Sequence, residues 1–228
     1  MMVLLVRSDS SLRTVPVEKV ARLMWFHHEP SDLVVWSDGQ RVGHLRLHPK
    51  VREGDGARVL EYSGNVQVRL PGSPLHRISW DGVADFDADF GLTGLLLGLG
   101  VKDVSLERAE IVVKPSENRA HFRVLNVSGV ELESSEYSLD EQGLKKILRQ
   151  VDLDPAIYDS LRSPGTATPK VSAQESSLMI HHERAKTYLI EVRQGGQTLL
   201  EAHISELGQV LRVKTLVGYS FAPDDLLP

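Results

Sequence analysis

The chain has 228 residues, of which 41% are hydrophobic and 25% charged, so it is long enough to bury one substantial core. Its net charge is -5 and its Lys and Arg residues form no dense cluster, which argues against a nucleic-acid partner. The absence of cysteine excludes disulfides, thiolate nucleophiles, Cys-ligated zinc and iron–sulfur clusters together.

The chain starts with a short apolar run, residues 1–6. This run is shorter than the apolar region of a signal peptide, which has about 7 to 15 residues. It is interpreted either as the remnant of a leader or membrane anchor, or as the start of a first strand. We predict an N-terminal extension over residues 1–14 and a single β-rich domain over residues 15–228. No later stretch approaches the roughly 20 apolar residues that span a bilayer.

The first predicted helix covers residues 16–28. Its apolar residues recur at three- and four-residue steps, Pro16 suits a first helical position, and Pro30 ends the helix. A short strand over 33–36, an Asp38-Gly39 hairpin turn and an alternating return strand over 41–48 follow. The sequence then predicts a charged loop over 49–56 and two strands, 58–63 and 65–70.

The centre of the chain, residues 79–91, shows strict alternation. From residue 83 to residue 90, alanine and phenylalanine alternate with valine and aspartate, which predicts a strand with one dry face and one wet face. Three more strands are predicted after it, over 106–114, 119–127 and 129–137. Together they indicate a large antiparallel sheet.

Residues 90–101 are uncharged and include five leucines and four glycines. Each glycine in the interior of a helix costs about 1 kcal/mol relative to alanine, so a helix is disfavoured. Two interpretations stay open. The segment is either a buried bend or irregular plug, or a lid over an apolar ligand or a loop at a membrane surface.

The C-terminal part begins with a second predicted helix, over 139–150, because Ser138 and Glu141 match a capping box and apolar residues follow at helical steps. A hairpin turn over 140–143 is the alternative. A third, short helix over 154–161 and a flexible loop over 163–177 come next. Strands over 188–193, 198–205 and 210–216 and a tail over 223–228 complete the chain.

Three groups of residues invite a metal or anion. The aspartates at 85, 87 and 89 have the spacing of an EF-hand, but the glycine and glutamate that such a loop needs are replaced by Phe90 and Leu96. Two His-His-Glu triplets, 27–29 and 181–183, combine ligands for zinc or iron, but neighbouring histidines diverge, so a site requires both triplets. The strand 41–48 places His44, Arg46 and His48 on one face, where they suit an anion or simply a wet surface. The glycine-rich phosphate motifs and the serine nucleophile motif are absent.

The layout resembles bacterial envelope proteins of the lipoprotein-carrier type. The features that carry this resemblance are a leading helix, the hairpin before Arg41-Val42-Gly43, many antiparallel strands, a helical interruption and final hairpins near Gly218-Tyr219. The resemblance implies a curved, incompletely closed sheet that wraps helices and shelters an apolar ligand, and no functional residue is transferred with it.

We therefore predict a mainly β fold: a large curved antiparallel sheet or open β-barrel with two or three packed helices. The expected function is noncatalytic binding of an apolar or lipidic ligand in the concave side of the sheet, in the periplasm or cell envelope and near a membrane, without metal or cofactor. The alternatives are an interaction or scaffold module with a filled core and no ligand, and a metal-dependent hydrolase that uses the His-His-Glu triplets. For the location, the cytoplasm stays open as the alternative to the envelope. The predicted ligand-binding residues are Phe86, Phe90, Leu92, Leu95, Leu96, Leu97 and Leu99.

Overall fold

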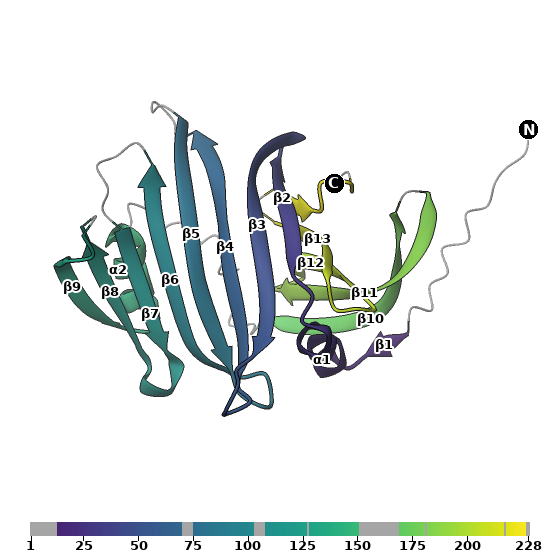
Figure 1. The fold of residues 1–228 in the computed structure, drawn as a ribbon, viewed down its shortest axis with the longest axis horizontal. Helices are drawn as coiled ribbons and strands as arrows, with labels where there is room; N and C mark the ends of the chain where they lie inside the picture. The colour runs from purple at the N-terminus through teal and green to yellow at the C-terminus, as the bar shows by residue number, and fades with distance from the viewer. Residues whose placement is uncertain are drawn as a thin grey trace, which may run out of the picture.

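A computed structural model of the chain describes residues 13–69, 75–102, 108–126, 128–150, 169–180, 182–216 and 218–226. These residues form one open β-sheet with two α-helices (Figure 1). In chain order the elements are β1 (Thr14–Val15), α1 (Val17–His27), β2 (Ser31–Ser37), β3 (Gln40–Val51), β4 (Arg58–Arg69), β5 (Leu75–Phe86), β6 (Leu92–Lys102), β7 (Arg108–Lys114), the 3-10 turn η1 (Pro115–Glu117), β8 (Arg119–Leu125), β9 (Glu131–Ser138), α2 (Glu141–Gln150), β10 (Lys170–Ile180), β11 (Glu183–Gln194), β12 (Gln197–Ser205), β13 (Val210–Thr215) and β14 (Tyr219–Ala222).

The strands pair in the order β1-β10-β11-β12-β13-β14-β2-β3-β4-β5-β6-β7-β8-β9. Every pairing in this order is antiparallel, and strands β2 to β9 are joined in simple succession. Strands β1 and β9 form the two edges and lie at opposite ends of the molecule (Figure 1), so the sheet is not closed. This confirms the predicted fold class.

Helix α1 connects β1 to β2, which are separated in the sheet by β10 to β14. It therefore crosses those strands, and its fully buried Val20 is the centre of the main apolar core. The remaining buried members of this core come from strands on both sides of the helix: Val15, Leu33, Ala173, Tyr188, Ala202, Ile204 and Val210. The apolar stripe predicted for residues 16–28 thus covers the sheet, as the 3.6-residue period requires.

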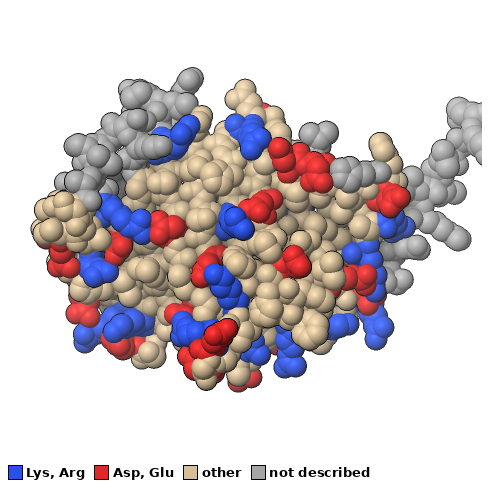
Figure 2. Space-filling view, in the orientation of Figure 1, with Lys and Arg blue, Asp and Glu red and all other residues tan. Residues whose placement is uncertain are grey.

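The sheet has two chemically different faces. The face that contacts α1 includes Leu33 and its cross-strand partner Leu45, and we call it the inner face. Helix α2 lies on the same side, behind β7 and β8 in Figure 1. The opposite, outer face is the one seen in Figure 2, where positive and negative side chains are interspersed without a large area of one sign.

Three glycines on the inner face allow neighbouring strands to curve closely. A Cβ atom on Gly43 or Gly82 would overlap a backbone carbonyl of the next strand, that of Asn65 or of Leu96, and one on Gly64 would lie 2.5 Å from the carbonyl oxygen of His44. No side chain fits at such distances, so the curvature of β3 to β6 depends on glycine at these positions.

Several predicted elements are wrong at their ends. The predicted loop at 49–56 starts three residues too early, because β3 continues to Val51, and the two strands predicted around Gly64 form the single strand β4. The loop predicted for 163–177 is contradicted from Lys170 onward, where the chain forms β10. The tail predicted from residue 223 is preceded by a strand, β14, that was not predicted.

The central strand ends earlier than its alternation predicts. Strand β5 stops at Phe86, and the next residues form a tight turn in which the Asp87 carboxylate accepts hydrogen bonds from the backbone N–H groups of Asp89, at 2.9 Å, and Gly91, at 2.7 Å. Phe90 adopts a positive φ of 64°, and Ala88 is exposed. The prediction that all even positions from 84 to 90 face the interior is therefore wrong for Ala88, because a local Asx turn replaces the end of the strand.

The segment 90–101 was also misinterpreted. It is neither a bend nor a plug nor a loop, because from residue 92 onward it forms β6, which pairs along its length with β5 and β7. Its glycines lie beside side chains of the neighbouring strands: Arg108 lies over Gly98, and the shorter Asp85 and Ser79 lie next to Gly94 and Gly100.

Both α-helices were predicted. Helix α2 begins at Glu141, two residues later than expected, and Asp140 caps it by accepting a hydrogen bond from the Gly143 N–H at 2.8 Å. The Ser138 capping box and the alternative hairpin turn are therefore wrong. The predicted third helix, over 154–161, lies outside the described residues. The predicted division at residue 14 is not tested and stays a prediction.

Candidate functional site: the apolar inner face

Strands β3 to β7 present three adjacent rows of uncharged residues on the inner face. The register places them side by side, one residue from each strand per row: Leu45, Gly64, Trp80, Leu99 and Ala109; Leu47, Tyr62, Gly82, Leu97 and Ile111; Pro49, Leu60, Ala84, Leu95 and Val113. Apart from Pro49, Gly64 and Ala84, these residues are only half-buried. A contiguous apolar surface that the protein does not fully cover marks a site for an apolar ligand or partner.

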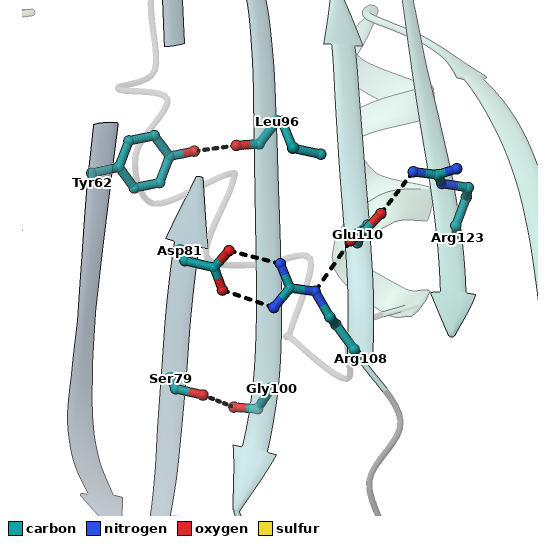
Figure 3. A network of polar contacts seen from close by, with 8 residues as sticks. All are labelled: Tyr62, Ser79, Asp81, Leu96, Gly100, Arg108, Glu110 and Arg123. Carbon is teal, nitrogen blue, oxygen red and sulfur yellow. Dashed lines mark hydrogen bonds and ion pairs between the residues drawn. The ribbon is translucent and has the colours of Figure 1, made fainter. Parts of the chain in front are cut away.

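Two aromatic rings lie flat across this surface because glycines lie beneath them. Tyr62 of β4 lies over Gly82 of β5, and Trp80 of β5 lies over Gly64 of β4. The Tyr62 hydroxyl reaches β6 and donates a hydrogen bond of 2.8 Å to the carbonyl oxygen of Leu96 (Figure 3). Burial, helped by the negative charge of Asp81, raises the pKa of Tyr62, so the hydroxyl stays protonated and remains a donor.

The end of helix α1 closes one end of the inner face. The indole N–H of Trp25 donates a hydrogen bond of 3.2 Å to the Val59 carbonyl oxygen, and the ring packs on Phe86 and Phe90 at centroid distances of 5.4 and 5.6 Å. The guanidinium of Arg58 also lies over the Phe90 ring, 4.3 Å from its centroid.

The predicted ligand-binding residues separate into three groups. Leu95, Leu97 and Leu99 lie on the inner face, in the three apolar rows. Leu96 points to the outer face, and Leu92 lies at the start of β6 with 40% of its surface exposed. Phe86 and Phe90 contact Trp25. The structure thus brings together the three odd-numbered leucines, and whether they bind a ligand stays a prediction.

Sequence reasoning missed Tyr62, Trp80 and Trp25 as parts of this site. For the two rings on the sheet a signal existed, since a Tyr or Trp two residues from a glycine on the same strand recurs in β4 (Tyr62, Gly64) and β5 (Trp80, Gly82). Which ring lies over which glycine depends on the register between the two strands, and a single sequence does not give that register.

The outer face of the same strands is polar, and four charged side chains cross it in a continuous chain (Figure 3). Arg108 of β7 extends over Gly98 of β6 and donates two hydrogen bonds, of 2.8 and 2.7 Å, to the carboxylate of Asp81 on β5. Its Nε donates to Glu110 at 3.1 Å, and Glu110 also accepts from Arg123 of β8 at 2.7 Å. The hydrogen bonds to Asp81 raise the pKa of Arg108 further above its ordinary value. These contacts link β5, β7 and β8 across the outer face, and each of the four charged groups pairs with one of opposite sign, so we interpret the chain as structural.

The metal and anion candidates are placed as follows. In the part of the chain that the structure describes, no three His, Asp or Glu side chains lie close enough to hold a metal ion. His28 ends helix α1 with a φ of 54°, His182 lies in a turn, and His181 lies outside the described residues. His44, Arg46 and His48 do share the outer face, where Arg46 lies 3.6 Å from Asp32 and His48 lies 4.0 Å from Glu61.

The predicted calcium-like aspartates have separate roles. Asp85 pairs with Arg52 across the outer face, as expected for a charged residue on the wet side of a strand, and Asp87 organises the turn after β5. Neither α-helix of the described residues has the length and apolar character needed to cross a bilayer.

Comparison with known proteins gives a limited structural similarity. No family model matches the chain, and a search of curated proteins found no match. Among solved structures, the chain is similar to a beta-barrel-like protein of a domain of unknown function, DUF1849, from Brucella abortus. The two chains are 8% identical, the similarity covers 84% of this chain and 92% of that chain, and the TM-score is 0.40.

Proposed function

We propose that the protein binds an uncharged apolar or lipidic ligand on the inner face of β3 to β7. The observation that supports this proposal is the set of three apolar rows, which have no charged residue and are mostly half-buried. A face that only completed a core would be covered by other parts of the chain. Its aromatic residues, Tyr62 and Trp80, add large flat surfaces on which an acyl chain packs.

The lipoprotein-carrier resemblance of the sequence supports the same function, and an envelope or periplasmic location is part of the proposal. Noncatalytic action is also proposed, since the site offers apolar contact and the single hydroxyl donor of Tyr62, which already binds the Leu96 carbonyl. Cell fractionation of the source organism tests the location independently of ligand binding.

The binding experiment uses the neutral fluorescent probe N-phenyl-1-naphthylamine and native mass spectrometry of the purified protein. We expect saturable fluorescence enhancement by the full chain, together with co-purified lipid that solvent extraction removes. Failure of both signals would rule out the proposal and favour the alternative of an interaction module with a filled core.

Two neighbouring leucines on β6 provide matched variants that locate the site. Leu97→Gln changes the middle inner row, whereas Leu96→Gln changes the outer face one residue away. Since burying a leucine side chain contributes about 1.5 to 3 kcal/mol, we expect the first variant to weaken probe binding about tenfold or more, and the second to leave it unchanged. Equal effects of the two variants would place the probe elsewhere.

A further inference from the structure

The inner face continues beyond its three apolar rows toward the end of helix α1. The next row on this face consists of Val51 of β3, Arg58 of β4, Phe86 of β5 and Leu92 of β6, and the register pairs each residue with its neighbour. In the four rows taken together, Arg58 is the only charged residue. A single cation therefore lies at one end of an otherwise uncharged surface.

The guanidinium of Arg58 is held in place but keeps two donor nitrogens available. Its Nη1 donates to the backbone carbonyl oxygens of Asp87, at 2.8 Å, and Ala88, at 2.6 Å, and the group lies over the Phe90 ring. Its Nε and Nη2 have no acceptor among the described residues, and neither nitrogen is shielded from solvent. Because the side chain is already ordered, an oxygen of a ligand can bind these nitrogens at a small entropic cost.

The charges around Arg58 favour an uncharged oxygen over an anion. The carboxylate of Asp87 accepts hydrogen bonds from backbone N–H groups, and the nearby Asp89 is exposed, so neither forms an ion pair with a cation of the described residues. Arg52, at the same end of the sheet, already pairs with Asp85. The carboxylates of Asp87 and Asp89 therefore offset the attraction of Arg58 for an anion, whereas a carbonyl oxygen accepts a hydrogen bond without that repulsion.

The length of the inner face beyond Arg58 suits one acyl chain. Gly64, in the most distant of the three apolar rows, lies six residues from Arg58 on β4. Since a strand rises about 3.4 Å per residue, the apolar rows extend about 20 Å from the cation. The hydrocarbon core of a bilayer is about 30 Å thick and holds two acyl chains end to end, so one lipid chain spans about 15 Å. The rows therefore have room for one such chain.

We propose that the ligand of the inner face is an uncharged long-chain ester, such as a monoacylglycerol, whose carbonyl oxygen binds Arg58 and whose acyl chain lies along the apolar rows. This inference rests on the function proposed above and adds the ligand class and the direction of the ligand. A hydrogen bond from a charged donor is stronger than one between neutral groups, so the ester oxygen orients the ligand. Leu92, in the same row as Arg58, is 40% exposed, so the head group keeps contact with water.

The test displaces the naphthylamine probe from the full chain with 1-monolauroylglycerol, an uncharged ester, or with laurate, an anion of the same chain length. We expect the ester to bind on the order of tenfold more tightly than laurate, because only the anion is repelled by the carboxylates beside Arg58. In side-chain NMR spectra of the unchanged protein, the Nε–H signal of Arg58 should shift when the ester binds. The probe has no oxygen acceptor and should not produce this shift.

Two variants show whether Arg58 holds the head group. Arg58→Met keeps an unbranched side chain but removes the donors, so the affinity for 1-monolauroylglycerol should fall on the order of tenfold relative to the affinity for the probe. Arg52→Met is the matched control, because Arg52 pairs with Asp85 on the outer face, and it should leave ester binding unchanged. The NMR measurement uses the unchanged protein, so it stays decisive if Arg58→Met does not fold.

Three results would each overturn this inference: tighter binding of laurate than of the ester, an unchanged affinity ratio in Arg58→Met, or an Nε–H signal of Arg58 that does not respond to the ester. None of them affects the proposed function, as long as the probe binds and Leu97→Gln weakens its binding. Absence of probe binding by the unchanged protein would instead reject the proposed function, and the ester would then have no site.

Discussion

On both faces of strands β4 to β7, a long side chain lies over a glycine of a neighbouring strand, but the two faces have different chemistry. On the inner face, aromatic rings lie over Gly64 and Gly82, while on the outer face the guanidinium of Arg108 lies over Gly98. In both cases the missing side chain leaves space for a long one from the neighbouring strand. The inner pairs create a smooth apolar surface, whereas the outer one creates an ionic link across three strands.

The difference between the faces lies in how much each depends on burial. Trp25, at the end of the inner face, is 7% exposed, whereas the side chains of Arg108 and Asp81 on the outer face are 40% and 54% exposed. Apolar burial contributes in proportion to the area removed from water, but exposed ion pairs contribute little. Changes on the inner side should therefore cost far more stability than changes on the outer side.

The largest effect is expected from Trp25→Ala. The substitution removes the packing on Phe86 and Phe90 and the hydrogen bond to Val59, and a buried tryptophan replaced by alanine typically costs about 3 to 5 kcal/mol. Urea denaturation followed by circular dichroism measures the free energy of unfolding. Phe26→Ala, on the same helix at 75% exposure, is the control and should change stability by less than about 0.5 kcal/mol. Similar losses for the two variants would contradict the placement of Trp25.

A smaller loss is expected from Gly82→Ala, which tests the curvature of the inner face. The added methyl group would overlap the Leu96 carbonyl and the Tyr62 ring, and overpacking of this kind costs about 1 to 3 kcal/mol or more. Gly94→Ala is the matched control on β6, because the nearest atom to its methyl group is the Asp85 Oδ2 at 3.4 Å, an ordinary contact. Should both variants melt at the temperature of the unchanged protein, Gly82 would have no role in shaping the sheet.

The sequence predicted the fold class and both described α-helices because these depend on local periodicity. Alternation identified most strands, and the three-to-four residue spacing identified α1 and α2. The alternation pattern failed at residues 87–91. There the side chain of Asp87 binds backbone N–H groups and ends the strand, while the alternation in the sequence continues. The two-residue period alone does not distinguish a strand from a turn in which apolar and polar residues happen to alternate.

The candidate site was only partly predicted, and the reason is similar. The leucines of residues 92–99 were correctly singled out as unusual, but the segment was not recognised as a strand, so the opposite directions of Leu96 and Leu97 were missed. Tyr62 and Trp80 join the site only through the register of β4 against β5. Trp25 joins it only because α1 crosses from one edge of the sheet to β2. Both relations are long-range and leave no periodic signal.

On the outer face, the pair Asp81 and Arg108 should contribute less than about 1 kcal/mol, since both side chains are largely exposed. A double-mutant cycle with Asp81→Asn and Arg108→Met measures the coupling energy, which should decrease as salt is added. The pair Arg119 and Glu136, at 60% and 52% exposure, is the comparison and should couple more weakly still, because it is less buried. A coupling energy above the loss caused by Gly82→Ala would reverse the ranking of the two faces.

The smallest effect on the outer face is expected from the titration of His203. Burial first, and the charge of Arg212 second, lower its pKa below the ordinary value of 6.5, so the unfolded chain binds a proton more readily than the folded one. Stability is therefore fully present above pH 6.5, decreases as the pH falls below that value, and stops decreasing once the pH is below the folded pKa. The chain contains other histidines, so the measured quantity is the difference between the wild type and His203→Gln in urea denaturation from about pH 7.5 to about pH 5.5. The variant should lose less stability than the wild type over that range. If the wild type lost the same amount or less, the imidazole would be as easily protonated in the fold as outside it, and burial would not lower its pKa.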